Sequence, residues 1–281
     1  MLRNNTTKPI ILLVDNGSLR ANATLQLRKL SQQLGVVADC KIYPVSLNHA
    51  DKIPLDDLGG KAAWIFQIFM RQFLQQGWRD FIILPLFFGK SSAITTLISN
   101  HLMSFQSRYI DMTFQIADVV YPLPKSEPIL VGIFYDHIMT TVQQAAFPLK
   151  NIVVVDHGSP LPRVTAVRQH LVHCLQAKFS ADTLLEQAVM ERREGDEYLF
   201  NGILLKDWLI DKAKVGEKTA IVSLLFFLAG RHAGEEGDIE MICQQVMRDY
   251  PHFKIAICPL VAEHPQLVAL LRTRLGVCND A

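Results

Sequence analysis

The sequence lacks the long apolar runs and the leader of a membrane-bound or exported protein. No stretch reaches the roughly 18 uninterrupted apolar residues that a membrane-spanning helix needs. The polar segment 1–9 has neither the apolar core nor the small-residue cleavage site of a signal peptide. We therefore expect a soluble, cytoplasmic protein with no membrane partner.

Paired cysteines and the H-E-x-x-H motif are also absent. The five cysteines are scattered, and no two form a C-x-x-C pair. These absences argue against a zinc knuckle, a contiguous iron–sulfur motif and a metalloprotease helix. We expect buried free thiols in a reducing compartment at positions Cys40, Cys174, Cys243, Cys258 and Cys278.

The chain has little net charge. Twenty-eight basic and 27 acidic residues nearly cancel, which predicts no nucleic-acid partner and requires a local cluster for any charged ligand. Hydrophobic residues make up 49% of the chain, enough apolar material for a folded core.

Short apolar runs alternate with segments of helical spacing. Residues 10–15 form an apolar run that ends in a turn, and residues 19–34 follow with helical spacing up to Gly35, which we expect to end the helix. Similar pairs recur along the chain. Strands alternating with helices predict βαβ units and a parallel sheet.

The second half of the chain repeats the first. A shift of 141 residues places Asp15 on Asp156, Gly17 on Gly158 and Gly89 on Gly230. Matches at turn positions in a fixed order indicate an internal duplication. The predicted fold class is α/β, with two similar flavodoxin-like parallel-sheet lobes facing each other across a cleft. We place the first repeat at residues 1–148 and the second at residues 149–281.

The two repeats differ where chemistry is expected. His157 and His232 each come just after an apolar strand of the second repeat, whereas the first repeat has Asn16 and Ser91 at these positions. Ligands of open parallel sheets bind at the carboxyl ends of the strands. Imidazole binds Co²⁺, Ni²⁺ or Fe²⁺ and takes up protons near neutral pH, so we expect the two histidines to share one site.

Charged residues surround these histidines in the sequence. Glu235 and Glu236, with Asp238 after them, follow His232 closely, and we expect one of the two glutamates to relay protons. The segment 190–202 mixes arginines with aromatic residues and has no counterpart in the first repeat.

These segments together resemble a known family. The tetrapeptide DHGS at 156–159, the segment LFFLAGRH at 225–232, GDI at 237–239 and the closing residues 258–265 are similar, in this order, to the class II chelatases of the CbiX type. The family pattern reads roughly G-H-G-S, then P-x-F-L-x-x-G-x-H, D-I-P and P-L-G-x-H-P. Asp156, Leu225 and Glu240 depart from it.

The resemblance implies insertion of a divalent metal, cobalt or ferrous iron or nickel, into sirohydrochlorin, a step of cobalamin or siroheme biosynthesis. The metal is then a substrate, and no organic cofactor is implied. His157 and His232 would hold the metal. The flat, carboxylate-rich tetrapyrrole would meet guanidinium and hydroxyl groups. The candidates are Ser159, Arg163, Arg192, Arg193 and Arg231.

Two other functions fit the same residues. A non-catalytic carrier of a tetrapyrrole or a metal needs only the lobes and their cleft. A metal-assisted hydrolase would use the histidines and acidic residues, but it lacks a second histidine cluster. Because an internal duplication often takes the place of a homodimer, we expect a monomer or a weak homo-oligomer.

Overall fold

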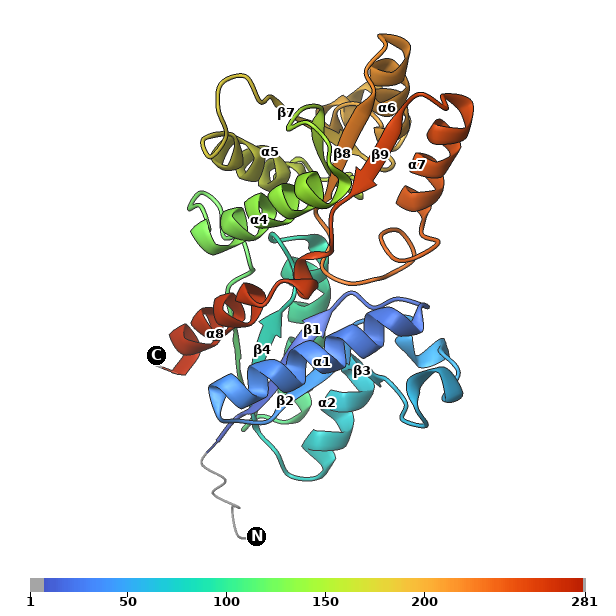
Figure 1. Ribbon diagram of the computed structural model, residues 1–281. Helices are drawn as coiled ribbons and strands as arrows, with labels where there is room; N and C mark the ends of the chain where they lie inside the picture. The colour runs from blue at the N-terminus through green and yellow to red at the C-terminus, as the bar shows by residue number, and fades with distance from the viewer. Residues whose placement is uncertain (1–7, 280–281) are drawn as a thin grey trace. The chain divides into compact units, whose positions relative to one another are not determined.

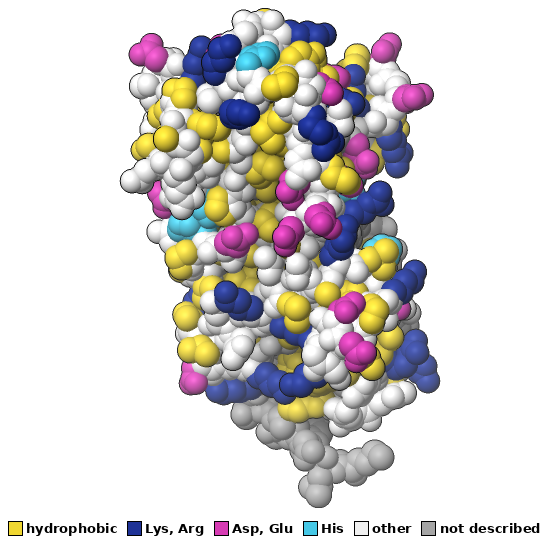
Figure 2. All heavy atoms as spheres, turned by 45° about the vertical axis from the view of Figure 1, so that its right-hand side comes forward, with side chains coloured by type: hydrophobic (Ala, Val, Ile, Leu, Met, Phe, Trp, Pro, Cys, Tyr) yellow, Lys and Arg dark blue, Asp and Glu magenta, His cyan; other side chains and the backbone are white. Residues whose placement is uncertain are grey.

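The structure of the chain is a computed structural model that describes residues 8–279 (Figure 1). Its described residues form two compact units, one of residues 8–122 with 268–279 and the other of residues 123–267. Within the described range, none of the helices is sufficiently long and apolar to span a membrane. Basic and acidic side chains are interspersed on the face shown in Figure 2, as the small net charge of +1 predicts.

The first unit contains a five-stranded parallel sheet in the order β3-β2-β1-β4-β5. Its central strand is buried along its whole length, which explains the uninterrupted apolar run in the sequence. A π-helical segment, Ala93–Ile98, leads into α3. The strands are β1 (Ile10–Asp15), β2 (Ile42–Ser46), β3 (Trp64–Ile65), β4 (Asp80–Pro85) and β5 (Thr113–Ile116), and the helices are α1 (Ala21–Ala38), α2 (Phe66–Gln75), α3 (Ser99–Arg108) and most of α8 (Gln266–Asn279).

The second unit contains a four-stranded parallel sheet in the order β7-β6-β8-β9. Helices α4 and α5 pack together on one side of the sheet, and α6 and α7 pack together on the other (Figure 1). The strands are β6 (Ile152–Asp156), β7 (Leu185–Val189), β8 (Thr219–Leu224) and β9 (Lys254–Ile257), and the helices are α4 (Pro128–Ala145), α5 (Pro162–Gln176), α6 (Leu205–Lys214) and α7 (Asp238–Asp249).

The two sheets confirm the predicted duplication. Strands β2-β1-β4-β5 of the first sheet appear in the same order as β7-β6-β8-β9 of the second. Only β3 has no full counterpart. At the corresponding edge of the second sheet, β7 is joined to the next segment by a single bridge, between Val189 and Leu204. The chain therefore has the predicted α/β class with two similar parallel-sheet lobes.

The compact units do not follow the predicted division at residues 148 and 149. Helix α4, the last helix of the first repeat, packs on β8, β9 and α5 of the second unit. Helix α8, the last helix of the second repeat, belongs mainly to the first unit, where Arg274 donates hydrogen bonds to the carbonyls of Val119 and Val120. Each repeat thus gives its final helix to the other unit, an exchange that helical spacing alone does not reveal.

Gly35 does not end its helix, contrary to the sequence-based expectation. Helix α1 continues to Ala38, and Asp39 caps it in the left-handed conformation with φ of 49°. A side chain at position 35 would place its Cβ 2.8 Å from the carbonyl oxygen of Cys40. Glycine is therefore explained here by the close approach of the returning chain. The thiols that the structure describes are free, with Cys243 and Cys258 buried.

Candidate active site

The two histidines lie together at the carboxyl edge of the second sheet. Strands β6 and β8 are parallel neighbours, with Val155 beside Leu224. His157 directly follows β6, and the loop after β8 carries His232. Their ring centroids are 4.6 Å apart, with the ring planes inclined by 66°. Two separate strand ends thus place two imidazoles at one point, as the sequence predicts.

A glycine turn brings a carboxylate to His157. Gly158 has φ of +94°, and a Cβ there would lie 1.9 Å from the carbonyl oxygen of Glu191, so only glycine fits. The backbone N–H of Glu191 donates to the carbonyl of His157 at 3.1 Å. This contact holds the end of β7 against the turn. The Glu191 carboxylate then lies 3.1 Å from Nε2 of His157.

Both ring nitrogens of His157 face hydrogen-bond acceptors. Nδ1 lies 3.1 Å from the carbonyl oxygen of Gly158, and Nε2 faces Glu191. A neutral imidazole can donate to only one of these acceptors, whereas a protonated imidazole can donate to both. The structure thus places one acceptor at each ring nitrogen of His157, and one of these acceptors, Glu191, is exposed to solvent.

A second carboxylate orients His232. Asp238, the first residue of α7, lies with Oδ2 2.6 Å from Nδ1 of His232. A neutral ring with its proton on Nδ1 donates to this carboxylate and leaves the lone pair of Nε2 for a cation. Both side chains are about three-quarters buried, at 28% and 27% exposed, so the pair is held more firmly than the one at His157.

The two glutamates predicted to relay protons are not in contact with the histidines. Glu235 and Glu236 are exposed in the turn before α7. The backbone N–H of Glu236 donates to the side chain of Glu240, and no described contact joins either glutamate to an imidazole. The helix begins at Asp238, and this residue, rather than Glu235 or Glu236, meets His232. In this structure the carboxylates beside the imidazoles are therefore those of Asp238 and Glu191.

The predicted substrate-binding side chains lie on three loops and one helix. The hydroxyl of Ser159 accepts a hydrogen bond from the N–H of Leu161 and thereby steadies the turn into α5. Arg163 is exposed in the first turn of α5. In the segment 190–202, Arg192 donates to the carbonyl of Gly202 at 2.7 Å, and the guanidinium of Arg193 lies 5.8 Å from the ring centroid of Tyr198.

Arg231 adds a cation next to the histidine pair. It directly precedes His232, its side chain is 74% exposed, and its Nε lies 3.6 Å from the carboxylate of Asp238. An exposed guanidinium in this place can turn toward an incoming anion with little cost, because its ion pair is long and faces solvent.

The first unit has the same turns with neutral side chains. A Cβ at Gly17 would lie 1.9 Å from the carbonyl oxygen of Asn48, as at Gly158 and Glu191. This geometry makes Asn48 the counterpart of Glu191. Together with Asn16 and Ser91 at the histidine positions, it shows that three ionisable groups of the second unit are replaced in the first.

The aspartate before the first turn is buried without a full set of partners. Oδ1 of Asp15 has no hydrogen-bond partner among the described residues, and burial raises the pKa of Asp15 from 3.8 to about 6. Unfolding releases the carboxyl group to its ordinary pKa. Stability from this group is therefore fully present below about pH 4 and is lost as the pH rises through 6.

We expect Asp15→Asn to raise the free energy of unfolding at pH 7.5 by up to about 3 kcal/mol, and to give no such gain at pH 4. Urea unfolding of both proteins at the two pH values measures the difference. The exposed Asp57 offers the matched control, since Asp57→Asn should change stability equally at both. An Asp15→Asn effect that is independent of pH would contradict this account.

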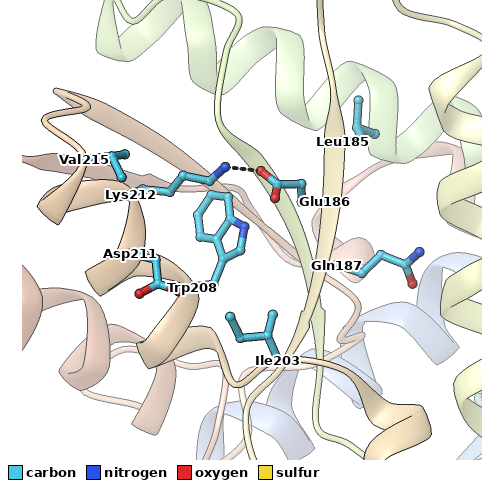
Figure 3. A pocket seen from close by; sticks show the side chains of 8 residues that line it. All are labelled: Leu185, Glu186, Gln187, Ile203, Trp208, Asp211, Lys212 and Val215. Atoms are coloured by element: carbon cyan, nitrogen blue, oxygen red, sulfur yellow. Dashed lines mark ion pairs between the residues drawn. The ribbon is translucent and has the colours of Figure 1, made fainter.

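A separate cavity of about 430 Å³ runs along the outer edge of β7 (Figure 3). It is lined by β7 residues, by Ile203 and by α6 residues that include Trp208 and Lys212, and it contains none of the predicted site residues. The structure also has no cluster of three or more His, Cys, Asp or Glu side chains in residues 8–279 that could hold a metal ion. The histidine pair at the carboxyl edge of the second sheet is therefore the candidate site.

Comparisons with known proteins identify a family model that covers the part of the chain carrying this site. The CbiX family model matches residues 151–277, a range that includes both histidines, Glu191 and Asp238. No curated protein matches the sequence.

Several solved structures share the fold at low sequence identity. SirB from Bacillus subtilis with Fe³⁺ is 14% identical, with a TM-score of 0.68 over 96% of this chain and 94% of that one. The sirohydrochlorin chelatase SirB from Bacillus subtilis subspecies spizizenii, in complex with cobalt, has a TM-score of 0.66 at 14% identity over the same shares. CbiX, the terminal enzyme of siroheme biosynthesis in denitrifying bacteria, has a TM-score of 0.58 at 14% identity over 95% of this chain and 98% of that one.

The family match and the paired histidines fall in the same half of the chain, and the shared fold extends over both units. Residues 151–277 thus match the CbiX family, within a chain that shares the two-lobed fold of the solved SirB and CbiX chelatases.

Proposed function

We propose that this protein inserts a divalent metal, Co²⁺ or Fe²⁺, into sirohydrochlorin. The observation that carries the proposal is the pair of imidazoles 4.6 Å apart, each in contact with its own carboxylate. Insertion requires one M²⁺ to enter the ring and two pyrrole N–H protons to leave. Two imidazole–carboxylate pairs supply a metal-binding group and a proton path for each of these protons.

The two histidines have different parts in this mechanism. His232, with Nδ1–H donated to Asp238, presents Nε2 to the metal. His157 binds the metal through Nε2 when Glu191 swings aside, and it takes up a pyrrole proton once the metal has moved into the ring. Glu191 is 63% exposed, so it can change position at small cost and pass the proton to water. Arg163, Arg192, Arg193 and Arg231, with Ser159, meet the carboxylates of the substrate.

The test is anaerobic incubation of the protein with sirohydrochlorin and each metal, followed by absorbance. We expect Co²⁺ or Fe²⁺ to enter the ring faster than in the absence of protein. Ni²⁺ is the third metal tested in the same way. A non-catalytic tetrapyrrole carrier would instead bind sirohydrochlorin tightly and leave the spontaneous rate unchanged. That result would replace the enzyme assignment with the carrier.

The first unit should be silent in the chemical step. We expect Asn16→Ala and Ser91→Ala to leave the insertion rate within a few-fold of the wild type. Asn16 is exposed, and the buried Oγ of Ser91 has no hydrogen-bond partner among the described residues, so neither truncation breaks a described contact of its side chain. The same absorbance assay measures the rate. A loss as large as that caused by His157→Ala would show that the first unit takes part in the reaction.

A further inference from the structure

A fully buried arginine lies beneath the histidine turn. Arg168 on α5 is 2% exposed, and its guanidinium forms an ion pair with Asp156, the residue before His157. Nη1 also donates to the carbonyl of Ala188 at 3.0 Å, and Nη2 donates to the carbonyl of Asn201 at 2.6 Å. A buried charge is tolerated only when its hydrogen-bonding groups are satisfied in this way.

The partners of Arg168 are the backbones that carry the site. The Oδ1 of Asp156 that meets Arg168 also accepts the N–H of Gly158 at 3.1 Å, which fixes the turn holding His157. Ala188 lies near the end of β7, three residues before Glu191. One guanidinium therefore ties the strand that leads to His157 to the strand that leads to Glu191.

Asn201 extends the same network to the segment 190–202. Its Oδ1 accepts from the N–H of Ser159 at 3.0 Å and from the hydroxyl of Thr165 at 3.1 Å. Its Nδ2 donates to the carbonyl of Ser159 at 2.9 Å and to that of Tyr198 at 3.1 Å. Since Arg168 holds the Asn201 carbonyl, it also fixes the base of the segment that carries Arg192 and Arg193.

The remaining guanidinium nitrogen is oriented by β7. Gln187 leaves β7 on the side opposite to Trp208 (Figure 3), and its Oε1 accepts from Nε of Arg168 at 3.3 Å. The guanidinium is thus held at all three nitrogens, and it cannot turn without breaking contacts to several segments. Such a fork cannot be reproduced by a lysine, which presents a single ammonium group.

The first unit shows what the fold looks like without this arginine. The shift of 141 residues places Leu27 at the position of Arg168. Asp15, the counterpart of Asp156, is left with an unpartnered Oδ1. The fold of the unit therefore does not need the arginine. The arginine occurs in the unit that has His157, Glu191 and His232, and it is missing where they are missing.

We propose that Arg168 is the positioning residue of the site, which sets His157 and Glu191 relative to His232 through Asp156, Ala188 and Asn201. This inference deepens the proposed function and rests on it for its catalytic meaning, but the positioning itself can be measured without the reaction.

Three variants separate positioning from folding. Arg168→Leu copies the first unit. Arg168→Leu combined with Asp156→Asn also removes the buried carboxylate that would lose its partner, so most of the lost stability should return. Arg168→Lys keeps the charge opposite Asp156 without the fork. The matched control is Arg28→Leu, because Arg28 on α1 also donates to backbone carbonyls, those of Leu58, Lys61 and Ala62.

The first readout is the imidazole NMR signals of His157 and His232, assigned with the alanine variants, and the second is Co²⁺ affinity without tetrapyrrole. We expect both imidazole environments to change and Co²⁺ binding to weaken about tenfold in Arg168→Leu and in the double variant. Arg168→Lys should fall between them and the wild type. Arg28→Leu should match the wild type in both readouts.

A double variant that is stable and has wild-type imidazole signals and Co²⁺ affinity would overturn the proposal, since Arg168 would then serve stability alone. If Arg168→Leu does not fold, the double variant and Arg168→Lys decide the question by the same two readouts. If the variants give the expected NMR and Co²⁺ results but the wild type inserts no metal, the proposed function is overturned and the positioning role of Arg168 remains.

Discussion

His157→Ala and His232→Ala should each lower the rate of metal insertion by about 10²–10⁴-fold, the usual size of a lost acid–base group. Each variant also removes one of the two nitrogens that hold the metal. His157 is 44% exposed and lies in a turn, so its truncation opens no core cavity and the fold should persist. The absorbance assay gives the rate, and circular dichroism checks the fold.

The double variant provides a sharper test of a shared site. Because both imidazoles act on one ion, the effects of the two substitutions should be less than additive in free energy. His252 offers a matched control in the same unit, since it is an exposed histidine whose described contacts are with the carbonyl of Ala213 and the ring of Tyr250. His252→Ala should insert metal at the wild-type rate. Full additivity would mean that His157 and His232 serve separate steps.

The histidine pair could be predicted from the sequence because its signals are local. Each histidine follows an apolar run, and the ungapped shift exposes a neutral residue at the same position of the other repeat. Parallel neighbouring strands then bring the two turns to the same edge of the sheet. No long-range detail of packing was needed to predict that His157 and His232 would meet.

The comparison of the two repeats did not identify Glu191, for a physical reason. The connection from β6 to β7 differs in length from the one between β1 and β2, so the shift of 141 residues that matches His157 to Asn16 no longer matches Glu191 to Asn48. Their equivalence appears only in the backbone, where Gly17 and Gly158 each approach the carbonyl of that residue. The resemblance between the turns is therefore geometric at this point.

The exchange of the final helices and the burial of Arg168 could not be predicted from the sequence either. The apolar face of α4 is compatible with either sheet, and only packing decides that it covers β8 and β9. Arg168 stands in the middle of a helix, where a charged residue usually faces solvent. Its burial depends on Asp156, Ala188 and Asn201, which come from three other segments.

The carboxylates give the second large effect. We expect Asp238→Asn to lower Co²⁺ affinity and insertion rate by about 10–100-fold, the range for outer partners of metal-binding histidines. The Asp238 carboxylate accepts the Nδ1 proton of His232 at 2.6 Å and so keeps Nε2 unprotonated. An asparagine can instead turn its NH₂ group toward Nδ1, which favours the other tautomer and puts the proton on the metal-binding nitrogen.

The sequence and the structure make different predictions for the neighbouring carboxylates, and one series of variants decides between them. If only the carboxylates that contact the histidines take part in the reaction, Asp238→Asn and Glu191→Gln reduce the insertion rate. Glu235→Gln and Glu236→Gln then have little effect. Glu191→Gln should leave Co²⁺ affinity nearly unchanged while slowing insertion, because the exposed Glu191 carries protons away and does not orient His232. Losses at Glu235 or Glu236 that equal the loss at Asp238 would mean that the turn before α7 rearranges when substrate binds, so that these carboxylates reach the histidines only then.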